Sequence, residues 1–97
     1  MSVASAEIST SCVSESGMSV YDLYLDLEKK TGEIKYSYMD QEIFYKVHII
    51  SDKDNILKGV ALFNRSNTGE TKGTPFEFQY DQEEKLFSEL NLNAICK

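Results

Sequence analysis

Residues 22–38 read DLYLDLEKKTGEIKYSY, and this stretch decides the fold class. Leucine occupies every second position from 23 to 27, and Ile34, Tyr36 and Tyr38 alternate with polar residues in the same way. A period of two is typical of a half-buried strand, whereas a helix places apolar residues three and four positions apart. Gly32 lies between the two runs and suits the positive φ of a tight turn, so the stretch predicts a β-hairpin. A helix over residues 20–30, capped by Ser19, is the alternative.

Further strands are expected on both sides of this hairpin. Residues 42–51 (EIFYKVHIIS) are rich in β-branched and aromatic residues, and residues 56–64 (ILKGVALFN) and 74–81 (TPFEFQYD) continue the pattern. Residues 39–41 predict a turn, and residues 51–55 and 65–73 predict polar loops. The Ser-rich residues 1–17 contain either a short first strand or a frayed terminus.

The end of the chain changes character. Asp81 is followed three positions later by Glu84, which is the pattern of a capping box, and Leu86, Phe87 and Leu90 then follow at helical spacing. We therefore expect a short helix from Gln82 to Leu90, after which residues 92–96 either finish it or form a last strand. The fold class expected is mainly β (α+β): an antiparallel sheet or small β-sandwich of four to six strands with one short C-terminal helix.

Size and charge limit the functions that are open to the chain. Its 97 residues predict a single globular domain over residues 18–97, preceded by the Ser-rich segment 1–17. The net charge of −6 opposes direct binding to nucleic acid or to an anionic membrane surface. No stretch is apolar for the roughly 20 residues of a membrane span, and the N-terminus lacks the pattern of a secretory signal, so we expect a cytoplasmic protein.

Few residues suggest catalysis. His48, the single histidine, shares the mixed face of its expected strand with Lys46 and is interpreted as a solvated side chain. Cys12 and Cys96 lie near opposite ends of the chain; a disulfide between them is possible, but two reduced thiols fit a cytoplasmic protein better. The spacing of these residues does not match a zinc site. We therefore expect no catalytic residue, no metal and no cofactor.

The acidic residues form the candidate binding surface. One cluster comprises Glu77, Asp81, Glu83, Glu84 and Glu89, and a second includes Asp52 and Asp54. The residues expected to bind a partner are Glu77, Asp81, Glu83, Glu84, Asp52 and Asp54, with Tyr24 as an exposed aromatic anchor. A compact acidic domain is steered toward the positive cleft of a nucleic-acid-acting enzyme. The sequence therefore predicts a protein-binding module, an inhibitor or immunity protein that masks a basic partner such as a toxin or nuclease. The alternative is a structural or assembly protein that docks through a sheet edge, with a homodimer as one form.

Overall fold

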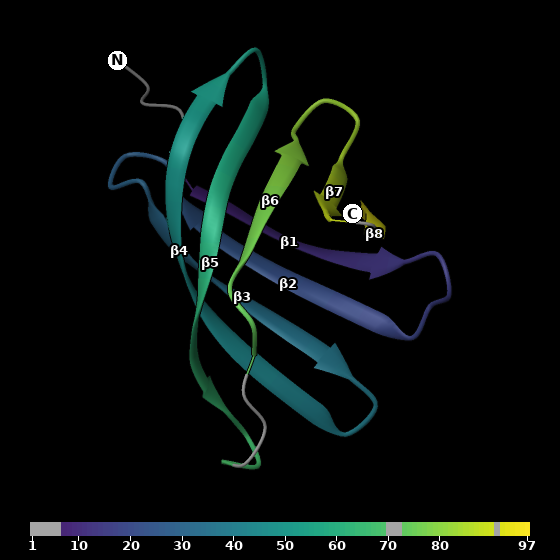
Figure 1. Ribbon diagram of the computed structural model, residues 1–97. Coiled ribbons are helices and arrows are strands. Elements are labelled where there is room, and N and C mark those ends of the chain that lie inside the picture. The colour runs from purple at the N-terminus through teal and green to yellow at the C-terminus, as the bar shows by residue number, and fades with distance from the viewer. Residues whose placement is uncertain (1–6, 70–72, 91) are drawn as a thin grey trace.

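The computed structural model describes residues 7–69, 73–90 and 92–97, and these residues form a closed antiparallel β-barrel (Figure 1). Each strand pairs with the next along the chain, and the last strand returns to pair with the first. The strands are β1 (Glu7–Ser14), β2 (Ser19–Asp26), β3 (Thr31–Tyr38), β4 (Gln41–Lys53), β5 (Ile56–Ser66), β6 (Phe76–Asp81), β7 (Leu86–Glu89) and β8 (Leu92–Cys96). The expected open sheet or sandwich of four to six strands is therefore wrong, because the described residues form eight strands that close on themselves.

Side chains fill the interior of the barrel. Successive residues of a strand point to opposite faces, so every second residue faces inward. On β2 these are Tyr21, Leu23 and Leu25, each at most 2 % exposed. Large aromatic side chains, among them Phe87 and Tyr80, fill the space from the opposite wall. An eight-stranded barrel is just wide enough for such filling, and the core runs along the barrel axis.

The predicted hairpin is present as β2 and β3, but its turn differs in detail. Lys30 adopts a φ of 59°, whereas Gly32 is a residue of β3 and pairs with Leu25. The expectation that Gly32 supplies the positive φ is wrong. Its small size is needed instead, because a Cβ at this position would meet the carbonyl oxygen of Tyr24.

The C-terminal helix predicted for Gln82–Leu90 is also wrong, since these residues form a turn, the strand β7 and a second turn. The carboxylate of Asp81 does accept hydrogen bonds from the backbone N–H groups of Glu83 and Glu84, both at 3.0 Å, as an N-cap would. Lys85 then adopts a φ of 55°, which ends the turn and starts a strand rather than a helix. The pairing of Tyr80 with Phe87 decides the outcome, because it buries Phe87 completely.

The barrel closes at a narrow seam between β1 and β8. Only three residue pairs join these strands, and one of them is Cys12 with Cys96. The two cysteines form a disulfide, so the expectation of two reduced thiols is wrong. Beyond the bridge, the backbone N–H of Lys97 donates a hydrogen bond of 3.1 Å to the carbonyl oxygen of Ser11. The disulfide therefore joins the two neighbouring strands that share the fewest residue pairs.

Two parts of the sequence analysis fall on residues outside the description. They are residues 1–6 of the Ser-rich segment, which precede β1, and residues 70–72 of the polar stretch 65–73. Within the described ranges, no helix is long and apolar enough to cross a membrane.

Candidate functional site

Two turns far apart in the sequence lie side by side at one end of the barrel. They join β4 to β5 and β6 to β7. Ile56, the first residue of β5, pairs with Asp81, the last residue of β6, and the backbone N–H of Gln82 donates a hydrogen bond of 2.9 Å to the carbonyl oxygen of Asn55. The structure thus brings together five of the seven predicted site residues, and we call this group the acidic end: Asp52, Asp54, Asp81, Glu83 and Glu84.

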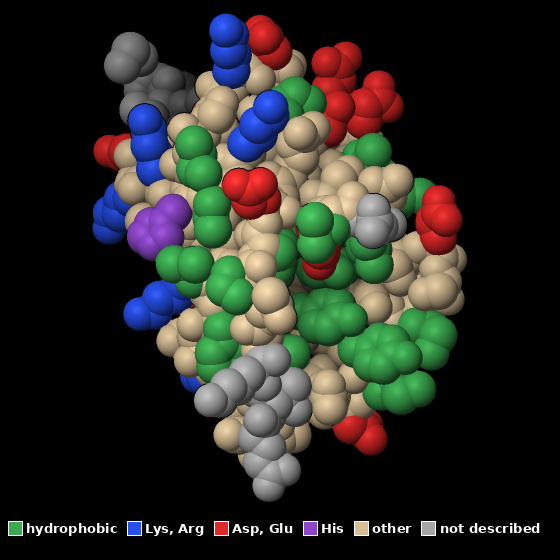
Figure 2. All heavy atoms as spheres, in the orientation of Figure 1, with side chains coloured by type: hydrophobic (Ala, Val, Ile, Leu, Met, Phe, Trp, Pro, Cys, Tyr) green, Lys and Arg blue, Asp and Glu red, His purple; other side chains and the backbone are tan. Residues whose placement is uncertain are grey.

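The acidic end is negative and largely exposed. Asp52, Asp54, Glu83 and Glu84 are exposed, whereas Asp81 is half-buried and uses its carboxylate to hold the turn. Figure 2 shows acidic side chains gathered at the top, where Figure 1 places the turn between β6 and β7. Lys53 and Lys85 lie in the same two turns, but the ion pairs between described residues all involve Lys35 instead. The surface therefore keeps an excess of negative charge.

Glu77 does not belong to the acidic end. It lies four residues before Asp81 on β6, which places it about 13 Å away along an extended strand. It is exposed and borders a shallow surface hollow of about 570 Å³ together with Ile50, Lys58 and Leu90. The sequence grouped Glu77 with Asp81 because both precede an expected helix, and that helix does not exist.

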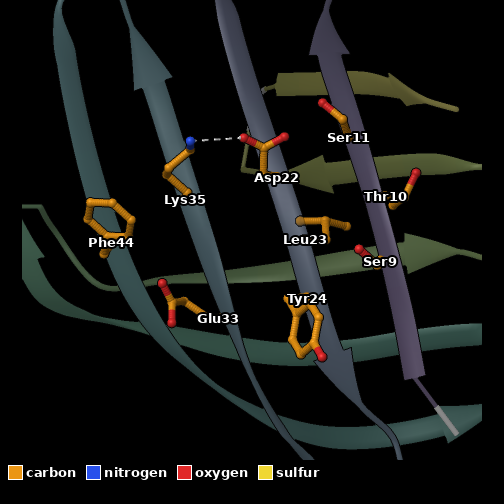
Figure 3. Close-up of a pocket in the computed structure, with 9 residues that line it drawn as sticks. All are labelled: Ser9, Thr10, Ser11, Asp22, Leu23, Tyr24, Glu33, Lys35 and Phe44. Carbon is orange, nitrogen blue, oxygen red and sulfur yellow. Dashed lines mark ion pairs between the residues drawn. The ribbon is translucent and has the colours of Figure 1, made fainter.

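Tyr24 lies apart from the acidic end, on the outer face of β2. It is 53 % exposed and borders a hollow of about 640 Å³ that extends across β1 to β4 (Figure 3). Lys35, in the middle of this hollow, is 3.7 Å from Asp22 and 3.8 Å from Glu42. Its ammonium group offsets only part of the negative charge of Asp22, Glu33 and Glu42, and the hollow lies on the outer face of β1 to β4 rather than at the acidic end. The aromatic anchor and the acidic residues are therefore separate features.

The phenyl ring of Phe44 forms the wall of the hollow opposite Tyr24 (Figure 3). The guanidinium of Arg65 lies 3.8 Å from the centre of that ring, a cation–π contact. His48 is exposed on the outer face of the same strand, β4. The described residues contain no group of three or more His, Cys, Asp or Glu side chains placed to hold a metal ion.

Glu89 was predicted among the surface carboxylates, but the structure groups it with tyrosines inside the barrel. Inside the barrel, at the end opposite to the acidic end, the hydroxyl of Tyr21 donates a hydrogen bond of 2.9 Å to Glu89 Oε2. Burial, this hydrogen bond and the charge of Glu89 raise the pKa of Tyr21 far above its usual value. Burial and the same carboxylate raise the pKa of Tyr45. The alternation that points Glu89 inward was hidden, because residues 82–90 were interpreted as a helix.

Comparisons with known proteins give no relative for this chain: no protein-family model, no curated protein and no solved structure shows significant similarity to it. The function is therefore argued from the geometry of the site alone.

Proposed function

We propose that this protein is a small acidic binding module that docks through its acidic end on a basic protein partner, such as a toxin or nuclease, and inhibits it. The hydrogen bond between Gln82 and Asn55 carries the proposal. It fixes the β4–β5 and β6–β7 turns to each other, so their carboxylates form one preorganised surface rather than two independent loops. Preorganisation lowers the entropy cost of docking.

The negative charge of the acidic end indicates which class of protein it can bind. Four exposed carboxylates in adjacent turns, on a chain of net charge −6, attract a positive cleft at long range. Such steering mainly raises the association rate, and salt weakens it. The same charge opposes direct contact with nucleic acid or an anionic membrane. Binding rather than catalysis is the role that these side chains support.

The disulfide bears on the compartment in which the protein works. Structural disulfides persist in oxidising surroundings and are rare in the cytoplasm. The Cys12–Cys96 bridge therefore supports an oxidising compartment, in place of the cytoplasmic location expected from the sequence. A basic partner that is itself secreted or exported fits this setting.

A charge-reversal experiment tests the proposal. One variant changes Asp52, Asp54, Glu83 and Glu84 to Lys, and it keeps Asp81 because that carboxylate holds the turn. A matched control makes the same change in net charge at four exposed carboxylates elsewhere: Glu15, Glu33, Asp40 and Glu77. Each tagged protein is used to capture partners from native extracts, and the association rate of the captured protein is then measured with purified components.

We expect the control variant to bind much like the wild type, and the acidic-end variant to associate at least about tenfold more slowly at low salt. The difference should shrink as salt is raised. Equal loss in both variants would show that only the net charge matters. Unchanged binding by the acidic-end variant would remove this surface from the proposal.

A second candidate function, assembly through a sheet edge, has one observation in its favour. On the side facing β6, β5 is paired only over Ile56–Ala61, so its residues 62–66 keep an open edge among the described residues. Open edges are docking sites for another strand. Sedimentation of the purified protein over a range of concentrations distinguishes the two candidates, since a dimer in the absence of a partner favours assembly.

A further inference from the structure

Glu89 points into the barrel rather than away from it. It pairs with Phe78 on β6 and with Leu92 on β8, and residues that pair across antiparallel strands share a face. Phe78 is buried in the core and Leu92 packs against it, so the carboxylate of Glu89 lies on the inner face. A charged group inside a small barrel is costly unless something compensates for its lost hydration.

Several aromatic residues lie on the same inner face as this carboxylate. Tyr21 contacts it directly through the 2.9 Å hydrogen bond, and the ring of Tyr36 lies 5.0 Å from that of Tyr21. The charge of Glu89 contributes to the raised pKa of Tyr45. The ring of Tyr45 packs edge-on against that of Phe76, with 4.9 Å between the ring centres. We call the group of Glu89, Tyr21, Tyr36, Tyr45 and Phe76 the aromatic mouth.

The aromatic mouth contains a negative charge but no positive one. Ion pairs between described residues involve Lys35, on the outer face, and none reaches Glu89. Among the described residues, the buried polar side chains are Ser14 and Ser19, so no buried Lys, Arg or His faces this carboxylate. The hydroxyl of Tyr21 offsets part of the desolvation cost but leaves the net charge uncompensated.

The mouth is open to solvent. Glu89, Tyr36 and Phe76 are only partly buried, whereas Tyr21 and Tyr45, deeper in the barrel, are 2 % and 5 % exposed. A small group can therefore approach the carboxylate past the aromatic rings.

We propose that the aromatic mouth binds an organic ammonium group, with Glu89 as its counter-ion and the partly exposed rings of Tyr36 and Phe76 beside it. A carboxylate combined with aromatic faces recognises such cations through charge and cation–π attraction together. This site is distinct from the acidic end and does not depend on the function proposed for it. The ammonium group can belong to a small quaternary amine or to a lysine side chain.

Ligand titration with matched probes tests the proposal. The probes are choline, its neutral carbon isostere 3,3-dimethylbutan-1-ol, and butylammonium as an analogue of a lysine side chain. Binding is followed by amide and tyrosine-ring NMR shifts and by tyrosine fluorescence, which is uncomplicated because the chain has no Trp. We expect choline or butylammonium to shift signals of the aromatic mouth and to bind at least about tenfold more tightly than the neutral isostere.

Two variants identify the groups responsible. Glu89→Gln keeps an acceptor for the hydroxyl of Tyr21 but removes the charge, and it should weaken ammonium binding about tenfold. Tyr36→Leu removes one ring and should weaken it severalfold, which keeps the proposal testable if Glu89→Gln does not fold. Glu28→Gln, at an exposed position in the β2–β3 turn that belongs to neither site, is the control and should bind like the wild type.

The relative affinities for choline and butylammonium show whether the bound ammonium group belongs to a quaternary amine or to a lysine side chain. Tighter binding of choline indicates a quaternary amine, and tighter binding of butylammonium indicates a lysine side chain. The proposal is overturned if neither cation binds, if the neutral isostere binds equally well, or if a folded Glu89→Gln variant keeps the wild-type affinity.

Discussion

Removal of the Cys12–Cys96 disulfide should cost this barrel a large part of its stability. The bridge links positions 84 residues apart, and closing a loop of that length in the unfolded chain is worth about 4.5 kcal/mol in the chain-entropy model. Domains of this size are stable by only about 5–15 kcal/mol in total. Without the bridge, three residue pairs and the hydrogen bond from Lys97 to Ser11 would have to hold β1 against β8.

The assay compares the wild type with a Cys12→Ala, Cys96→Ala double variant in urea, monitored by tyrosine fluorescence and circular dichroism. For a denaturant slope near 2 kcal/mol per molar, the expected loss lowers the unfolding midpoint by roughly 2 M. The wild type treated with a reducing agent should follow the variant. Hydrogen exchange adds spatial detail: amides of β1 and β8 should lose protection before those of β4 and β5, because the seam opens first.

Two results would refute this reasoning. The first is a midpoint that falls by less than roughly 0.5 M, which would place the bridge's contribution well below the entropy model. The second is an equal rise of hydrogen exchange in the β4–β5 hairpin and at the seam, which would mean that the barrel opens only as a whole.

Other predictions concern the tyrosines, a glycine and the β6–β7 turn. Because the pKa values of Tyr21, Tyr45 and Tyr80 are raised in the folded protein, their stabilising contribution is complete below about pH 10 and is lost as the pH rises further, so urea midpoints should fall above that pH. Gly59→Ala should cost about 1–3 kcal/mol, because the new Cβ would lie 2.7 Å from the ring of Phe78 and 2.8 Å from the carbonyl oxygen of His48. Asp81→Ala should cost about 1 kcal/mol in urea unfolding through the loss of two backbone hydrogen bonds.

Each of these predictions has a control. Tyr24→Phe, at an exposed hydroxyl, should leave the alkaline loss of stability unchanged, and an equally stable protein at pH 8 and pH 11 would contradict the linkage argument. Lys58→Ala, beside Gly59 but exposed, should be close to neutral. Asp81→Asn keeps a side-chain acceptor and should recover most of the loss; a variant as unstable as Asp81→Ala would assign the effect to charge instead.

Alternation in the sequence predicted most strands, but closure of the barrel depends on contacts that no local pattern contains. The period of two over residues 22–38 is a property of each strand alone, and the hairpin β2–β3 follows from it. The helix predicted for residues 82–90 is wrong because the local pattern there is compatible with two structures. Asp81 makes the same hydrogen bonds at the start of a helix and in a tight turn, and only the pairing of β7 with β6 separates the two outcomes.

The candidate site was predicted in part for a related reason. Asp54 was predicted in a polar loop and Glu83 at the start of a helix, but their proximity at one end of the barrel rests on the contact between Asn55 and Gln82, 27 positions apart. Glu89 was predicted only as part of an acidic surface cluster, because its inward orientation follows from the register of β7 with β6 and β8. Charge is visible in a sequence, whereas burial of a charge is a property of the fold.

The narrow seam between β1 and β8 has a consequence for engineering. The first and last strands are neighbours, with Ser11 and Lys97 joined by a backbone hydrogen bond, and Glu7 lies four residues, about 13 Å, before Ser11 on β1. A linker of a few residues can therefore connect Lys97 to Glu7 along β1. New termini can then be opened in an exposed turn such as that at Asp54 and Asn55. In such a circular permutant β8 and β1 are joined as a hairpin. The chain then begins with β5 and ends with β4, and the pairing of these two strands closes the barrel.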